Sequence, residues 1–282
     1  MSNRDRWIRI ALFVAVTYVW SGFFMGMAIA DGDITLLTAF GGMWSPFVGL
    51  LVTRLVFPDG RRRGSLAGLG WKWSRTKYQV GSFFLPGLYV GVAHLAVWVF
   101  GLAGFWDAPL SEVAVLVLKR MAMGVTVGSV LAFGEEVGWQ GFLVPQLYKM
   151  MSFTKTSLAR GLIWSLWHYP LIIGGVYGPS STPLWYRMLF FTITLTAVSF
   201  AFTWLRVRSG SLWTGVFLHA GHNIFIQSVY PRLTTHSDVL PYLTDEFGVL
   251  CAAAAVLTAL VFWMKRDVLP PAVQLPTPQD SA

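Results

Sequence analysis

The sequence predicts an all-α fold, a polytopic membrane bundle of about eight transmembrane helices, and three observations support it. Hydrophobic residues make up 55% of the chain and charged residues 12%, whereas soluble domains carry about 25% charged residues. Apolar runs of about 20 residues, long enough to cross a bilayer as a helix, recur along the chain. Aromatic residues are abundant, with 14 Trp and 21 Phe. We therefore expect a single integral-membrane domain over residues 1–266.

The apolar runs place the individual spans. The expected ranges are 7–30, 34–57, 79–103, 113–148, 157–176, 183–205, 211–229 and 246–264. The fourth range is too long for one crossing at a rise of about 1.5 Å per residue. Its first half, residues 112–123, either lies along the membrane interface or belongs to a helix that tilts or extends beyond the bilayer. The first range lacks a small-residue cleavage site and is expected to be retained as a span.

Basic residues gather in alternate connections between these spans, and this asymmetry predicts the topology. One side holds Arg4, Arg6, Arg9, Arg61, Arg62, Arg63, Lys72, Arg75, Lys77, Lys149, Lys155, Arg160, Arg206, Arg208, Lys265 and Arg266. The other side holds Asp31, Asp33, Asp107, Asp238, Asp245 and Glu246, with Arg187 and Arg232 as exceptions. The positive-inside rule then predicts a protein of the cytoplasmic (inner) membrane with both termini cytoplasmic. The Pro-rich segment 267–282 is expected to be a disordered cytoplasmic tail.

The net charge of +8 has the same explanation, because the basic residues lie in short loops. We therefore expect no nucleic-acid partner. The longest basic connection, residues 58–78, combines R-R-R with W-K-W-S-R-T-K. Such a mixture of cations and aromatic rings is typical of segments that contact anionic lipid headgroups, so membrane lipids are expected partners. The only cysteine, Cys251, lies in an apolar run, which excludes an intrachain disulfide.

Two adjacent carboxylates, Glu135 and Glu136, lie inside the apolar run L-A-F-G-E-E-V-G-W-Q-G-F-L-V-P-Q-L-Y of residues 131–148. A charged side chain at the bilayer centre costs about 2.5–3.5 kcal/mol on insertion scales. Such residues therefore usually face the interior of a helix bundle and carry a function there. The alternative is that both carboxylates only hold helices together by pairing with a buried Arg or His.

Further polar residues lie at a matching depth on two other spans. Glu135 lies about 20 Å along its helix from Tyr148, His168 lies about 16 Å from Ser157, and His219 and Asn223 lie about 12 and 18 Å from Ser211. His219 and Asn223 are four residues apart and so share one helix face. We expect the four side chains to meet in the cytoplasmic half of the membrane or near its middle. His94 is expected to be a helix–helix hydrogen-bonding group outside this site.

This set of residue types suits the hydrolysis of a peptide bond. A carboxylate beside an imidazole can take a proton from water and pass it to a leaving amine. A second His and an amide on one helix face can donate hydrogen bonds to a developing oxyanion. A catalytic zinc site formed by Glu135, His168 and His219 is the alternative, because His and Glu are common zinc ligands. The H-E-x-x-H motif of many zinc proteases is absent from the sequence.

At these residues the chain resembles the CPBP family of CAAX-protease and bacteriocin-processing intramembrane endopeptidases. The family pattern reads E-E-x-x-x-R, F-x-x-x-H and H-x-x-x-N on successive membrane helices. Glu135 and Glu136, then His168, then His219 and Asn223 match it, within a motif core of residues 131–225. The resemblance implies that Glu135 and His168 activate water, that His219 and Asn223 form the oxyanion hole, and that Glu136 supports the site. It leaves open whether the reaction depends on glutamate alone or on a metal.

Two positions depart from the family pattern. Trp164 replaces the Phe, a mild change because both residues supply a ring one helical turn before His168. Gln140 replaces the Arg, which removes a cation one turn from Glu136. Glu136 is then either protonated or paired elsewhere. An Arg restored at position 140 is expected to be tolerated.

The sequence favours an intramembrane endopeptidase acting from a cavity open to the cytoplasm on a membrane-associated, CAAX-like or bacteriocin-like peptide. The alternatives are a weakly active or inactive membrane scaffold or immunity protein of the same fold, and a proton-coupled transporter. The missing internal repeat disfavours transport. A lipidated peptide substrate is implied by the family resemblance alone, and the sequence leaves the oligomeric state open.

Overall fold

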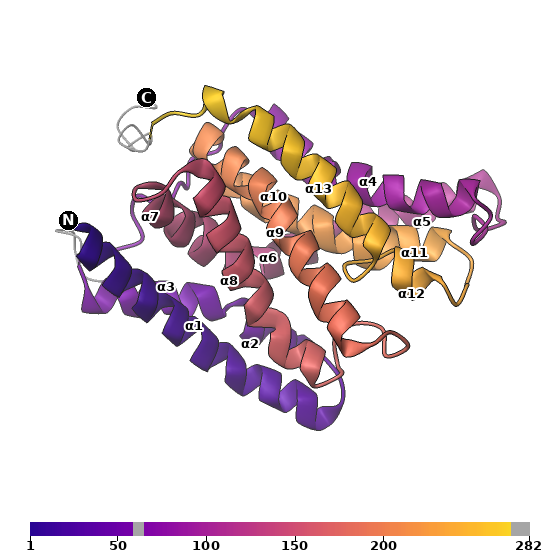
Figure 1. The fold of residues 1–282 in the computed structure, drawn as a ribbon, viewed down its shortest axis with the longest axis horizontal. Coiled ribbons are helices and arrows are strands. Elements are labelled where there is room, and N and C mark those ends of the chain that lie inside the picture. Colours follow the sequence, from indigo (N-terminus) through magenta and orange to yellow (C-terminus); the bar gives the residue numbers. More distant parts are fainter. Residues whose placement is uncertain (59–64, 272–282) are drawn as a thin grey trace.

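The computed structural model describes residues 1–58 and 65–271, and these residues form a helical bundle (Figure 1). The helices are α1 (Asn3–Asp31), α2 (Leu36–Met43), α3 (Ser45–Val56), α4 (Thr76–Val99), α5 (Leu110–Met123), α6 (Ser129–Gly138), α7 (Val144–Tyr148), α8 (Phe153–Ile173), α9 (Leu184–Ser209), α10 (Trp213–Ile224), α11 (Tyr230–Leu233), α12 (Leu240–Leu243) and α13 (Val249–Met264). Three π-helical turns, η1 (Gly124–Gly128), η2 (Trp139–Leu143) and η3 (Phe225–Val229), lie between consecutive helices. A 3₁₀ turn, η4 (Arg266–Val268), follows α13.

The expected all-α membrane fold is confirmed, and each expected span coincides with a helical segment. Within the described residues, five segments are long and apolar enough to cross a membrane: Asn3–Asp31, Leu36–Val56, Thr76–Val99, Leu110–Tyr148 and Leu184–Ser209. Helix α8, the segment from α10 to α11, and the shorter α13 occupy the remaining expected spans. The protein is therefore an integral membrane protein. The long fourth span is one continuous helical segment, and its first part, α5, contains no buried residue.

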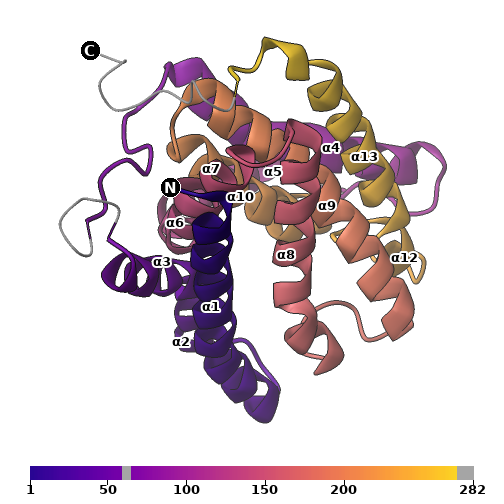
Figure 2. The same ribbon diagram turned by 60° about the vertical axis from the view of Figure 1, so that its left-hand side comes forward.

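The start of the first helix and the end of the last long helix lie on the same side of the bundle. Helix α1 and helix α13 run in opposite directions, so that the start of α1 and the end of α13 lie toward the left in Figure 1 and toward the top in Figure 2. This agrees with an even number of crossings. Arg61, Arg62 and Arg63 and most of the expected tail, residues 272–282, lie outside the described residues. At the start of that tail, the carbonyl of Pro270 accepts a hydrogen bond from Tyr148 (2.8 Å).

Two arginines that the sequence placed among the basic connections are instead buried within helices. Arg160 on α8 is 0% exposed. Arg206 on α9 is 7% exposed, and its guanidinium donates hydrogen bonds to the backbone oxygens of Gln140 (2.7 Å) and Leu69 (3.2 Å). The expectation that both lie in connections between spans is wrong, because each lies within a helix and is held by acceptors inside the bundle.

Glycines bring together the helices that carry the site. Helix α8 packs extensively on α9, and α10 on α4. A Cβ atom added at Gly161 of α8 would lie 2.5 Å from Cα of Thr196 on α9. A Cβ atom added at Gly221 of α10 would overlap the backbone oxygen of Phe83 on α4. Close approach of helix backbones through small residues is typical of membrane bundles. These contacts hold α8 close against α9 and α10 close against α4.

His94 on α4 has the expected role. Its Nδ1 lies 2.8 Å from the hydroxyl of Thr234, and its ring stacks on Tyr230 of α11 with 5.2 Å between centroids. His94 therefore ties α4 to the end of the α10–α11 segment, away from the candidate site.

Candidate active site

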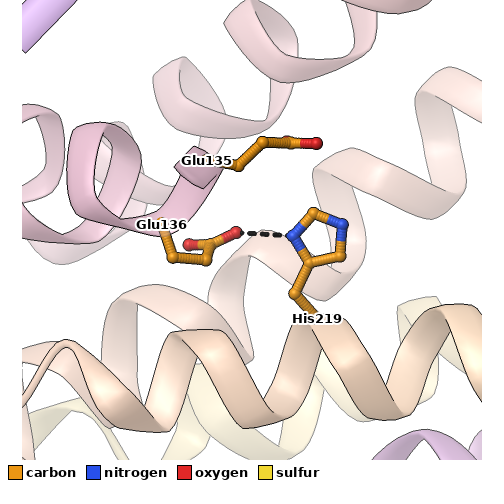
Figure 3. Close-up of side chains that lie close together, drawn as sticks. All are labelled: Glu135, Glu136 and His219. Carbon is orange, nitrogen blue, oxygen red and sulfur yellow. Dashed lines mark hydrogen bonds and ion pairs between the residues drawn. The ribbon is translucent and has the colours of Figure 1, made fainter. Parts of the chain in front are cut away.

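Glu135 and Glu136 on α6 converge with His219 on α10, as Figure 3 shows. One oxygen or nitrogen atom from each of the three side chains lies within 4.8 Å of the others. All three side chains are buried, with Glu135 1%, Glu136 0% and His219 3% exposed. Buried charges in a membrane bundle must be paired or hydrogen-bonded, so the partners of each group define the site.

Glu135 is oriented by two indole groups. Its Oε2 accepts hydrogen bonds from Nε1 of Trp139 (3.1 Å) on η2 and from Nε1 of Trp164 (2.9 Å) on α8. Its Oε1 accepts no hydrogen bond from the residues that the structure describes, and Glu135 lines a cavity. One carboxylate oxygen is therefore fixed, while the other is available to a reacting group. Sequence reasoning missed Trp139, although its spacing of four residues from Glu135 places both on one helix face.

Glu136 is paired with a cation from another helix. Arg160 NH2 lies 3.3 Å from Oε1 of Glu136, and both side chains are 0% exposed. The guanidinium also donates to Oγ of Ser199 (2.9 Å) on α9 and lies over the rings of Trp164 and Phe202, 4.2 and 4.0 Å from their centroids. Of the two expected outcomes for Glu136, pairing elsewhere is the one found. Sequence reasoning missed Arg160 because its position near the start of a span resembles a topology signal.

His219 is oriented by Glu136. Its Nδ1 lies 2.9 Å from Oε1 of Glu136, the contact drawn in Figure 3. A carboxylate held by Arg160 accepts hydrogen bonds, so Nδ1 of His219 carries a proton and donates. The second nitrogen, Nε2, is left on a ring that lines the cavity. With His219 as imidazolium, the charges of Glu135, Glu136, Arg160 and His219 sum to zero, which reduces the cost of burying them.

His168 and Asn223 complete the set on the cavity wall. His168 lies on α8, and its Nδ1 is 2.9 Å from the backbone oxygen of Trp164. Because a carbonyl only accepts, Nδ1 carries a proton, and in the neutral ring Nε2 then keeps its lone pair. Asn223 makes no side-chain hydrogen bond to other described residues, so its amide is available to a ligand. Glu135, His168, His219 and Asn223 all line one cavity of about 520 Å³, as expected from their common depth.

The cavity extends away from the basic connections. Its walls come from the last turns of α1 (Phe24, Met25 and Ala28), from α2, from the second half of α8, from the end of α10 with η3, and from the loops that hold Tyr177 and Glu246. These parts belong to the halves of the helices opposite the start of α1. The expectation of a cavity open to the cytoplasm therefore disagrees with the expected topology. From Glu135 the free space continues toward Tyr177 and Glu246.

The two departures from the family pattern have structural consequences. Gln140 is 0% exposed and makes no side-chain hydrogen bond to Glu136; its Cγ lies 2.5 Å from where a Cβ of Gly215 would be. Gln140 thus fills space where α10 approaches η2. Trp164 is more than a substitute ring, because its N–H orients Glu135 and its carbonyl orients His168. A Phe would supply only the second contact.

The donor set does not fit a metal well. The expected ligands were Glu135, His168 and His219, but the group that comes together contains Glu136 in place of His168. Both oxygens of Glu136 lie within 3.5 Å of Arg160, and Oε1 also contacts His219. A guanidinium at this position competes with a divalent cation for the same carboxylate.

Comparison with known proteins shows what one segment of the chain is similar to. Residues 116–225 match the model of the family described as Rce1-like, type II CAAX prenyl endopeptidase Rce1-like. The resemblance to the CAAX proteases is confirmed for this segment. This Rce1-like segment contains every residue of the candidate site. The chain is also 32% identical over 78 residues to "CAAX prenyl protease 2" of Methanococcus maripaludis, and the match covers 27% of this chain and 28% of that protein.

Proposed function

We propose that this protein is an intramembrane endopeptidase that hydrolyses a peptide bond with a water molecule activated by Glu135. The observation that carries the proposal is the carboxylate of Glu135, fixed at Oε2 by two indoles and open at Oε1 on a cavity shared with His168, His219 and Asn223. The Rce1-like segment supports the reaction class, because the named relatives are prenyl endopeptidases. The substrate proposed is a membrane-associated or C-terminally processed peptide, CAAX-like or bacteriocin-like.

The site residues divide the reaction between them. Oε1 of Glu135 takes a proton from water while Nε2 of His168 accepts a hydrogen bond from it, and the water oxygen attacks the peptide carbonyl carbon. The imidazolium of His219 and the amide of Asn223 donate hydrogen bonds to the resulting oxyanion. As the C–N bond breaks, Glu135 returns its proton to the amine nitrogen, which regenerates the carboxylate. Glu136 and Arg160 hold His219 in its donating orientation.

The cavity position bears on access. With the basic connections in the cytoplasm, as the positive-inside rule predicts, the substrate enters from the non-cytoplasmic half of the membrane. Exported or outer-leaflet peptides then fit better than peptides processed at the cytoplasmic face. Topology mapping with tags at residues 1 and 282 tests this, since periplasmic termini would place the cavity on the cytoplasmic side instead.

The test of the reaction is turnover of a fluorescence-quenched peptide library by the purified protein in nanodiscs. In Glu135→Gln, the amide oxygen can still accept the hydrogen bonds from both indoles, but the base is lost. We expect kcat to fall by about 10²–10⁴. Activity that survives this substitution would overturn the mechanism. Activity that is lost with a chelator and restored by zinc would instead support the metal-dependent reaction. A folded wild-type protein without turnover on any peptide would favour the inactive scaffold or immunity protein.

A further inference from the structure

A second polar cluster lies on the cavity wall and has no part in the proposed reaction. Its centre is Glu246, 4% exposed, in the loop between α12 and α13. Oε2 of Glu246 accepts a hydrogen bond from the hydroxyl of Tyr177, and Oε1 accepts one from Nε2 of Gln227 (2.8 Å). Nε2 of His222 lies 3.5 Å from Oε1 of Glu246, and Nδ1 of His222 contacts the hydroxyl of Tyr89 on α4.

The loop around Glu246 is built to hold this carboxylate in place. Asp245 adopts a left-handed conformation (φ 60°), and its Oδ1 accepts a hydrogen bond from the backbone N–H of Phe247 (2.7 Å). Phe247 then stacks on Phe191 of α9, with 5.1 Å between centroids. Tyr177 and Gln227 each donate to one oxygen of Glu246, and Nε2 of His222 lies beside it. Both oxygens of the carboxylate are therefore engaged, so it is not open to a ligand.

Tyr177 connects this cluster to the candidate site. Its ring lies nearly parallel to the imidazole of His168, with an interplanar angle of 24° and 5.8 Å between centroids. Phe191 closes the same pocket, 5.1 Å from His168 and 5.8 Å from Tyr177. The only hydrogen bond of His168 to the described residues is at Nδ1, with the carbonyl of Trp164. This bond holds one edge of the ring, and the ring contacts complete the orientation that directs Nε2.

We infer that Glu246 and Tyr177 are positioning residues for His168. Glu246 holds the hydroxyl of Tyr177, Tyr177 holds the imidazole plane, and Nε2 of His168 is thereby directed into the cavity. This inference rests on the proposed function for its catalytic consequence. The positioning itself is a property of the folded protein, whether or not that protein hydrolyses peptides.

The activity test compares substitutions that remove one link each. Tyr177→Phe keeps the ring and removes the hydroxyl, and Glu246→Gln keeps the size but removes the charge that strengthens the hydrogen bond from the Tyr177 hydroxyl. We expect each to lower kcat by about tenfold while KM stays within about twofold. This loss of kcat is smaller than the loss of about 10²-fold that a full 1 Å misplacement would cause. Tyr186→Phe is the matched control. The hydroxyl of Tyr186 on α9 also donates a hydrogen bond to another segment (2.5 Å to the backbone oxygen of Tyr242 on α12), but Tyr186 does not line the cavity. Equal kcat in Tyr177→Phe and Tyr186→Phe would overturn the inference.

A second measurement does not depend on activity. In protein labelled with ¹⁵N-histidine, the signal missing from His168→Asn identifies His168. We expect the wild-type signal to report a single neutral form protonated at Nδ1, and Tyr177→Phe and Glu246→Gln to broaden or split it while His219 is unchanged. An unaltered His168 signal in both variants would refute the positioning role. Altered signals in a protein that cleaves no peptide would leave the positioning role standing and refute the proposed function alone.

Discussion

A cation neutralises Glu136 in the buried site. The most direct test of this charge balance is to move the cation from one helix to another. In the protein, Arg160 supplies this cation from α8, whereas the family pattern places an Arg at position 140. Arg160→Gln leaves the carboxylate of Glu136 buried without its partner, which we expect to cost about 3–5 kcal/mol of unfolding free energy. It also removes the contacts of the guanidinium with Ser199 and with two aromatic rings.

Gln140→Arg alone is expected to be destabilising too, contrary to the expectation from sequence. Position 140 is 0% exposed, and Cγ of Gln140 already fills the space beside Gly215. A second buried cation beside a carboxylate that Arg160 has neutralised would cost several kcal/mol, roughly the penalty of an unpaired buried ion. In the double variant, however, the new Arg lies one turn from Glu136 and can pair with it.

The double variant Gln140→Arg/Arg160→Gln is therefore expected to be more stable than the sum of the single changes predicts. The expected coupling energy is about 1.5–3 kcal/mol, the upper part of the range for residues in one network. Unfolding in detergent, followed by intrinsic fluorescence with increasing temperature and denaturant, measures it. Ser199→Ala is the control, because it removes the other hydrogen bond of Arg160 without touching Glu136. Additive effects in the double variant would show that neutralising Glu136 does not govern stability.

Three further predictions concern single side chains. Asn223→Ala should lower kcat by about 10²–10³ with little change in KM, as expected for one oxyanion donor, and an unchanged kcat would exclude that role. Trp164→Phe should lower kcat and KM by different factors in peptide assays, because Glu135 keeps only the hydrogen bond from Trp139. Full activity would mean that one indole is enough to orient Glu135. Gly221→Ala should destabilise the protein by about 1–3 kcal/mol, the usual cost of overpacking, because the new Cβ meets the backbone of α4. Gly81→Ala, which meets nothing within 4 Å, should not, and equal melting temperatures of the two would contradict the close packing of α10 on α4.

The fold was predictable because it depends on apolar length, which the sequence displays directly. Each expected span coincides with a helix, and even the overlong fourth span was recognised as unusual. The common depth of Glu135, His168, His219 and Asn223 followed from counting residues along helices, and the four do share one cavity. Their catalytic roles stay a prediction.

The pairings within the site were not predictable, because they depend on how helices rotate against each other. The role of Arg160 could not be separated from that of a surface cation, since a position one to two turns into a span fits both. Glu246 resembled a loop acid until α12 and α13 brought it to His222 and Tyr177. The cavity lies on the side of the bundle where the helices are farther apart. Residue spacing along the sequence carries no information about the distances between helices.

The π-helical turns have a consequence for comparing this chain with its relatives. A π turn holds one residue more than an α turn, and in α10–α11 the turn η3 begins directly after Ile224, next to Asn223. Deleting one residue from 225–229 would restore a regular α-helix and rotate everything beyond it by about 100°, with a shift of about 1.5 Å. His219 and Asn223 would stay in place, whereas Arg232 would turn out of the cavity. A one-residue gap between related sequences at this position would therefore mark the gain or loss of this wide turn, and with it a different outer wall around an unchanged candidate site.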